Sequence, residues 1–284
     1  RFQYLETSLV LRAMVSHANF LEENMRGGIG IGRGALSMNA TSGASPGSLY
    51  GPESSEFRIV PDLDTFAPLP FAPGSARLLS ELCDVNLKHY EGDSRYFLRR
   101  AIAAAEKAGY SARVACESEF YLVKKEGNHY VPNTLGYGIE GFIGDEGYDA
   151  ANDYVQDFFQ TLGQMNVQVE RLKKESGPAQ IEVILRHAEA LKAADDFVTL
   201  RDAAKGVASK RGLIATFLPK LFQNEGPSGL HVHVSLVEKK SGKNFFFDQK
   251  DKRGMQLSEI GYQFIGGIMK HMKGLMPIAA PIPN

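Results

Sequence analysis

The alternation of polar and apolar residues over Leu230–Leu236 is the clearest local pattern in the chain. Successive side chains of a strand point to opposite faces, so His231, His233 and Ser235 share one face of a predicted strand. The leucines and valines between them share the other face, which predicts an apolar floor packed on a core. The turn-forming stretch Gly226–Gly229 leads into this strand. We therefore predict two imidazoles pointing the same way.

Periodicity elsewhere predicts strands mixed with helices. The predicted strands are Phe2–Val10, Phe57–Val60, Val114–Val123, Val167–Leu172, Ile181–Leu185 and Ile214–Leu218. The predicted helices are Ser16–Met25, Asp93–Gly109, Asp149–Met165, Ala188–Arg211 and Leu257–Met272. The glycine-rich Gly27–Gly34, the Ser37–Gly51 stretch and the lysine runs Lys173–Lys174 and Lys239–Lys240 are interpreted as loops. The strands favour an antiparallel sheet backed by helices, an α+β arrangement.

Composition narrows the class of protein. With 284 residues, 43% of them hydrophobic, the chain can build one large domain or two ordinary ones. A net charge of -1 gives no field that would gather nucleic acid, and no apolar run is long enough to span a membrane. Only two cysteines, Cys83 and Cys116, fit a reducing compartment, so we expect a cytoplasmic protein. The start at Arg1 and the turn-type end at residues 281–284 suggest a fragment.

Two acidic residues separated by one position are the first candidates for chemistry. Glu117 and Glu119 lie two apart on a predicted strand, so both carboxylates project from one face. Like charges at that spacing repel unless a cation sits between them. A divalent ion would meet this need. A solvated edge strand is the alternative interpretation.

Two further glutamates strengthen the metal interpretation. Glu175 ends one predicted strand and Glu182 sits on the next, and the Gly177–Pro178 turn between them can return the chain as a hairpin. Four carboxylates with His231 form a set of hard oxygen ligands and one imidazole, which suits Mg²⁺ or Mn²⁺ better than Zn²⁺.

Three motifs in this order resemble the glutamine synthetase family. They are Glu-x-Glu-Phe at residues 117–120, Glu-x-Gly-Pro-x-Gln-x-Glu at residues 175–182 and Gly-Leu-His-x-His-x-Ser-Leu at residues 229–236. The segment Val60–Arg77 is similar to the linker between that family's two domains. The resemblance implies an N-terminal β-grasp domain at residues 1–80 and a catalytic domain at residues 81–284 that lacks its C-terminal part.

The resemblance also implies residue roles and a reaction. It implies ligands of one metal ion at Glu119, Glu175 and Glu182, ligands of a second at Glu117 and His231, ATP contacts at Glu170, His233 and Ser235, and substrate contacts at Gly226 and Gly229. The implied enzyme is an ATP-dependent ligase, with Mg²⁺ or Mn²⁺, that joins the γ-carboxylate of glutamate to ammonia or another amine through γ-glutamyl phosphate. A homo-oligomeric ring is implied as well.

This chain departs from the family pattern in three places. Gly30–Ser37 stands where ammonia-using members carry an Asp-Gly-Ser-Ser motif, which favours a larger or differently charged amine. Gly226–Pro227 replaces the Asn-Gly that holds glutamate, and proline lacks a backbone donor. The arginines and the further metal-binding glutamate expected beyond Asn284 are missing, so we expect this chain alone to bind metal–ATP poorly and to show no turnover. A non-catalytic structural member of the family and a metal-dependent hydrolase are the alternatives.

Overall fold

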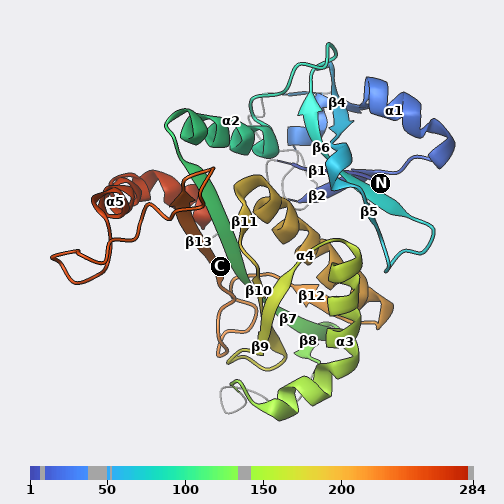
Figure 1. The fold of residues 1–284 in the computed structure, drawn as a ribbon. Helices are drawn as coiled ribbons and strands as arrows, with labels where there is room; N and C mark the ends of the chain where they lie inside the picture. Colours follow the sequence, from blue (N-terminus) through green and yellow to red (C-terminus); the bar gives the residue numbers. More distant parts are fainter. Residues whose placement is uncertain (7–9, 38–49, 52, 134–141, 281–284) are drawn as a thin grey trace. The chain divides into compact units, whose positions relative to one another are not determined.

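The computed structural model describes residues 1–6, 10–37, 50–51, 53–133 and 142–280. The turn predicted over residues 281–284 and most of the serine-rich loop predicted after Ser37 lie outside these residues. The chain divides into two compact units (Figure 1). Unit 1 comprises Arg1–Ala103, Asp157–Val167 and Ala194–Val207, and unit 2 comprises Ala104–Gln156, Gln168–Ala193 and Ala208–Asn284. The domain boundary predicted near residue 80 stays a prediction.

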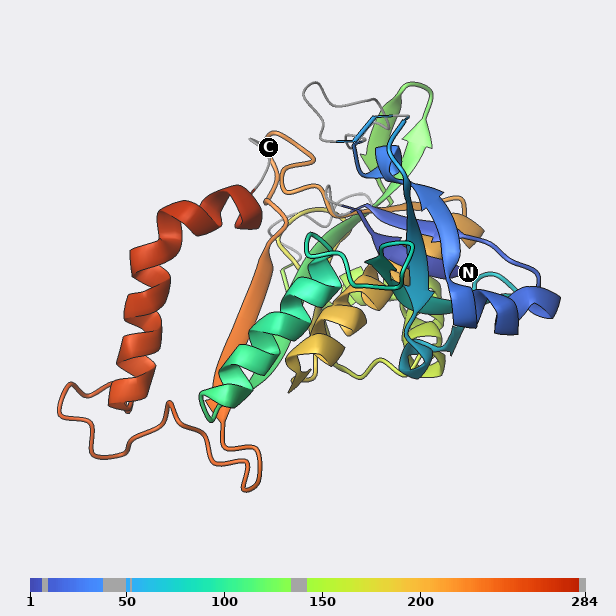
Figure 2. The same ribbon diagram turned by 90° about the horizontal axis from the view of Figure 1, so that it is seen from above.

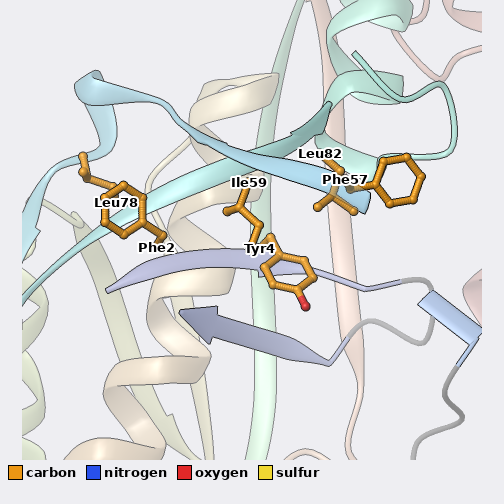
Figure 3. Close-up of a cluster of buried hydrophobic side chains, with 6 residues drawn as sticks. All are labelled: Phe2, Tyr4, Phe57, Ile59, Leu78 and Leu82. Carbon is orange, nitrogen blue, oxygen red and sulfur yellow. The ribbon is translucent and has the colours of Figure 1, made fainter. Parts of the chain in front are cut away.

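Unit 1 is built on a mixed sheet with the order β2-β1-β6-β4-β3. Its strands are β1 (Phe2–Leu5), β2 (Leu11–Met14), β3 (Ile29–Gly32), β4 (Glu56–Pro61), β5 (Ala67–Pro68) and β6 (Ala76–Cys83). β1 and β6 run parallel, and the other pairs are antiparallel. The core of this sheet consists of Phe2, Tyr4, Phe57, Ile59, Leu78 and Leu82 (Figure 3). The short helix α1 (Leu21–Gly27) precedes β3.

The glycine-rich stretch after α1 is a strand and not the predicted loop. Ile29 pairs with Ile59 and Ile31 pairs with Phe57 across β3 and β4. The two isoleucines pack against the core of unit 1, which outweighs the low strand propensity of glycine. An added Cβ at Gly30 would lie 2.6 Å from the Glu56 carboxylate and would push that flexible side chain aside. The 3₁₀ helix η2 (Arg33–Ser37) follows.

Unit 2 is organised around the long strand β7 (Ser111–Glu126). Its partners are β8 (His129–Pro132), β9 (Val169–Lys174), β10 (Gln180–Leu185), β11 (Ala188–Glu189), β12 (Ile214–Thr216) and β13 (Leu230–Val237). All of these pairs are antiparallel, with β9 joined through β10. β10 and β13 both pair with Glu117 and Ser118, so they lie on opposite edges of β7. The local order is therefore β9-β10-β7-β13.

The described residues include four long helices, as the periodicity predicted. They are α2 (Ser94–Lys107), α3 (Asp145–Gln164), α4 (Ala190–Lys210) and α5 (Glu259–Ala279). The predicted ends differ by a few residues, most of all at α5, which continues from the predicted Met272 to Ala279. None of the helices in the described ranges combines the length and apolar character needed to cross a membrane. The α+β class is confirmed.

The two faces of the central sheet in unit 2 have opposite character. Phe120, Ile181 and Val183 point to one face and are at most 4% exposed. The Phe120 ring packs edge-on against Tyr154 of α3 at 6.4 Å between centroids. Residues of the other parity, among them Glu119, face the opposite way. That second face carries the acidic residues that the sequence singled out.

The prediction of a buried apolar face beneath the histidine strand is wrong. Leu230, Val232 and Val234 of β13 are 47%, 55% and 37% exposed. Among the named strands β13 is recorded against β7 alone, and these apolar side chains are open to solvent. Figure 2 shows β13 beside β7, with α5 apart from both. From Ile265 to Ala280, each residue at the end of unit 2 is exposed.

Candidate metal centre

Strand register places a row of ionisable side chains across one face of the sheet in unit 2. Glu182 of β10 is directly opposite Glu119 of β7, and on the other edge of β7 His231 is directly opposite Glu117. Directly opposed residues of an antiparallel pair point to the same face. Lys173 of β9 is opposite Glu182, so it joins the same row.

Three carboxylates form the first cluster. Glu119, Glu175 and Glu182 each place an oxygen within 4.8 Å of the others. The β9–β10 hairpin brings Glu175 beside Glu182, as predicted from the turn between them. Glu182 is the most buried of the three, with its side chain 2% exposed. Three carboxylates this close repel one another unless a cation is present.

The second cluster shares one of these carboxylates. Glu117, Glu182 and His231 also have ligand atoms within 4.8 Å of one another. The Nδ1 atom of His231 lies 3.3 Å from one oxygen of Glu117, and the Nε2 atom of His233 lies 3.1 Å from the other. Both imidazoles therefore meet Glu117, and Glu182 joins the two clusters.

A lysine ammonium lies among the carboxylates. Lys173 Nζ is 3.0 Å from Glu175 Oε1 and 3.2 Å from Glu182 Oε2. The interpretation of Lys173 and Lys174 as a solvated loop is wrong, because both belong to β9 and Lys174 is only 3% exposed. Lys174 Nζ donates to the carbonyls of Glu175 and Gly177 and so holds the hairpin turn.

Gln180 links three parts of the site. Its Nε2 group donates to Glu119 Oε2 at 2.8 Å and to the Pro227 carbonyl at 2.9 Å, and its Oε1 accepts from the Gly177 backbone at 2.8 Å. The Gln180 side chain is buried, so these bonds are protected from water. Tyr121 adds a bond from its hydroxyl to the Gly226 carbonyl at 2.6 Å. One amide thus fixes a carboxylate and both neighbouring turns.

The donor set fits a divalent cation. Glu182 Oε1 is buried and accepts no hydrogen bond from any described group, so this carboxylate keeps an acceptor that a cation could satisfy. At Gly229 an added Cβ would lie 3.0 Å from Glu119 Oε1 and 3.2 Å from His231 Nε2, so the missing side chain keeps the space between them open. Carboxylate oxygens with one imidazole are ligands suited to Mg²⁺ or Mn²⁺.

The pKa values of the carboxyl groups in the site are shifted in different directions. Desolvation raises the pKa of Glu119, and the nearby Glu175 charge adds to that rise. Desolvation likewise raises the pKa of Glu182, although Lys173 opposes it. For Glu117, desolvation also acts upward, but His231 and His233 outweigh it and lower the pKa overall. Glu117 is therefore the easiest of these three to keep ionised.

The predicted nucleotide and substrate residues lie around the clusters. Glu170 sits at an irregularity in β9, exposed and 3.4 Å from Arg171. Ser235 lies half-buried on β13, two residues beyond His233. The backbone carbonyl of Gly226 accepts the hydrogen bond from the Tyr121 hydroxyl. These assignments stay predictions.

Sequence reasoning missed Lys173, Gln180 and Tyr121. A signal for Lys173 was present, since it lies two residues before Glu175 and extended chain would point both to one face. Tyr121 carried no comparable signal, because its hydroxyl bonds to the backbone of a turn 105 residues away in the sequence. Gln180 belongs to the motif at residues 175–182, but its bond to Pro227, 47 residues away, cannot be read from that motif.

The fold and this site define an α+β protein with a carboxylate–imidazole cluster on an antiparallel sheet. A family model described as glutamine synthetase, catalytic domain, matches residues 91–284. The chain belongs to the glutamine synthetase family. It is 36% identical over 236 residues to glutamine synthetase of Thermotoga maritima, covering 82% of this chain and 52% of that protein. It is 31% identical over 287 residues to glutamine synthetase of Methanosarcina mazei, covering 100% of this chain and 61% of that protein.

Solved structures share the fold. One titled as the crystal structure of a novel glutamine synthase homolog matches with a TM-score of 0.87 and 23% identity, over 98% of this chain and 64% of that chain. A structure titled as a GmaS/ADP complex matches with a TM-score of 0.86 and 22% identity, over 98% of this chain and 61% of that chain. The chain spans about half the length of several curated relatives that it matches.

Proposed function

We propose that the chain is the metal- and nucleotide-binding part of an ATP-dependent carbon–nitrogen ligase. The substrates are glutamate and ammonia or another amine, and the activated species is γ-glutamyl phosphate. The observation that carries this proposal is the pair of ligand clusters sharing Glu182, found in a member of the glutamine synthetase family. A structural protein has no use for so many ionisable groups facing one another.

The residues divide the work by position. Glu119, Glu175 and Glu182 would hold one divalent ion, and Glu117 and His231 a second. Such ions neutralise the charge that develops as a phosphoryl group is transferred. Glu170, His233 and Ser235 would contact the nucleotide. The turn at Gly226 and Gly229, fixed in part by Gln180 through Pro227, would bind the substrate.

The amine is proposed to be larger than ammonium or differently charged. The segment Gly30–Ser37 contains no carboxylate. The nearest acidic group to Gly30 is Glu56, and it is paired with Arg58 at 2.6 Å. An ammonium ion would find no free counter-charge on this segment, which makes its capture less favourable.

Further parts of the proposal concern the whole protein. The mixed sheet of unit 1, with its parallel β1–β6 pair, supports a β-grasp N-terminal domain ending near residue 80. A homo-oligomeric ring and a cytoplasmic location stay predictions.

Calorimetric titration with Mn²⁺ tests the metal-binding part directly. The chain should bind Mn²⁺, and ADP should bind more tightly once Mn²⁺ is present. Glu182→Ala should abolish metal binding. A folded chain that binds neither ligand would favour the non-catalytic alternative.

The amine is identified by phosphate release from ATP and glutamate with ammonia, ethanolamine, alkylamines and polyamines, using a form that includes the additional length found in relatives. Turnover with ammonia alone would refute the amine assignment.

A further inference from the structure

Lys173 holds a position in the site that the proposed reaction does not explain. Its ammonium lies 3.0 Å from Glu175 and 3.2 Å from Glu182, which belong to the three-carboxylate cluster. The register of β9 against β10 sets this position, because Lys173 and Glu182 are direct cross-strand partners. The contact therefore follows from the sheet and is not a chance meeting of surface side chains.

The ammonium neutralises charge that would otherwise be unbalanced. Glu182 is nearly fully buried, and Glu119 and Glu175 each bring an oxygen within 4.8 Å of it. Lys173 is the cation that the structure records against Glu175 and Glu182 among the described residues. A buried carboxylate cluster without a cation would be costly, so Lys173 stabilises the cluster in the metal-free protein.

A divalent ion needs the same two carboxylates. Metal–oxygen bonds of about 2.0–2.6 Å to either oxygen of these carboxylates would bring the ion close to an ammonium that lies 3.0 Å from Glu175 Oε1 and 3.2 Å from Glu182 Oε2. Like charges at such separations repel strongly, even with solvent screening. Lysine has a flexible stem, and the Lys173 side chain is 33% exposed, so it can move out to water. The ring of Phe142, itself 45% exposed, already lies 5.8 Å from Nζ.

We propose that Lys173 is a built-in counter-cation that a divalent ion must displace in order to bind. It holds Glu175 and Glu182 together before the ion arrives, and it lowers the affinity of the site for that ion. The inference rests on the metal site of the proposed function. It adds a residue that sets the concentration of divalent ion needed to fill the site.

Titration of the metal-free chain with Mn²⁺, without nucleotide, tests the counter-cation. Lys173→Met should bind Mn²⁺ at least about tenfold more tightly, because no cation has to leave the cluster. Lys173→Arg should stay near the original affinity. Lys124→Met is the matched control, because it removes the same charge from an exposed pair with Glu126 on the same sheet, and its affinity should be unchanged.

The outcomes separate this inference from the proposed function. Equal or weaker Mn²⁺ binding by Lys173→Met, with binding by the original chain intact, overturns the counter-cation alone. If neither chain binds Mn²⁺, the metal site and the counter-cation both fail.

A second measurement needs no variant. Acetylation of the original chain by an amine-reactive ester, followed by mass spectrometry, reports how freely each lysine reacts. Added Mn²⁺ should raise the rate at Lys173 several-fold, because the displaced ammonium leaves its two carboxylates, and should leave Lys124 unchanged. A Lys173 rate that stays constant or falls at saturating Mn²⁺ would contradict the displacement.

Discussion

The site has two halves that differ in how the protein supports them. The glutamate half, with Glu119 and Glu182, lies on central strands, and the Glu182 side chain is 2% exposed. The histidine half, with His231 and His233, lies on edge strand β13, and these side chains are 59% and 61% exposed. Both halves face the same side of one sheet.

The difference comes from the neighbours of each strand. β10 is paired on both edges, with β7 and β9, and its Val183 is completely buried behind the glutamates. β13 is recorded against β7 alone among the named strands, and its Val232 remains open to solvent. Alternation alone creates a polar face in both strands, but only β10 has a packed floor. Metal affinity should therefore depend mostly on the glutamate half.

The largest effect is expected at the residue that both clusters share. Glu182→Gln keeps the size of the side chain and removes its charge, so Mn²⁺ affinity should fall on the order of 100-fold or more. Calorimetric titration measures the loss, and circular dichroism verifies the fold. Glu126→Gln, at an exposed carboxyl of β7, serves as the control. Binding retained within a fewfold would show that Glu182 is not a ligand.

Gln180 should have the next largest effect, although it contacts no ion itself. Gln180→Leu removes the donor that orients Glu119 and the bond to Pro227. Loss of an orienting bond of this kind lowers metal affinity about 10- to 100-fold. Unfolding by urea should also show a cost of about 1–3 kcal/mol from the unsatisfied partners. Gln156→Leu on the exposed side of α3 should change neither quantity, and normal Mn²⁺ affinity in Gln180→Leu would refute the orienting role.

His231→Ala should weaken Mn²⁺ binding by only about tenfold or less. The exposed imidazole must lose side-chain freedom to bind an ion, and this offsets part of its contribution. His129→Ala, at an exposed histidine of β8, is the control in the same titration. A loss at His231 that exceeded the loss at Glu182 would reverse the ranking of the two halves.

The stability of the metal-free protein should depend on pH through the glutamate half. Because desolvation raises the pKa of Glu182, the folded chain holds a proton there more tightly than the unfolded chain does. The carboxyl therefore costs stability above its raised pKa, and this cost disappears as the pH falls toward the ordinary glutamate value. Thermal unfolding of the original chain and of Glu182→Gln measures this, and the variant's advantage should grow as pH rises. A constant difference would contradict the raised pKa.

The sequence predicts the elements and the grouping of ligand residues better than their support. Glu117 and Glu119 follow from alternation on one strand, and the closeness of Glu175 and Glu182 follows from the turn between them. Lys173 was misread because a pair of lysines is usual in solvated loops, whereas the register places it opposite Glu182. Local sequence patterns do not predict which distant strands pair or in which register.

The prediction that the apolar face of β13 is buried was wrong for a related reason. Alternation in Leu230–Leu236 fixes which side chains share a face, and the structure agrees with that much. Whether another element covers the apolar face depends on the rest of the polypeptide. The same limit applies to the glycines of β3, which form a strand because β4 supplies the partner and unit 1 the core.

The smallest effect should come from the apolar side of the histidine half. Val232→Thr changes a side chain that is 55% exposed, so the free energy of unfolding should shift by no more than about 0.5 kcal/mol. The same substitution at Val183, which is 0% exposed, buries a hydroxyl and should cost about 1–3 kcal/mol. Urea unfolding of both variants compares the cost in unfolding free energy of the same substitution on two strands, β13 and β10, that both pair with β7. Equal costs would mean that Val232 is covered in solution, and the two halves of the site would then be equally supported.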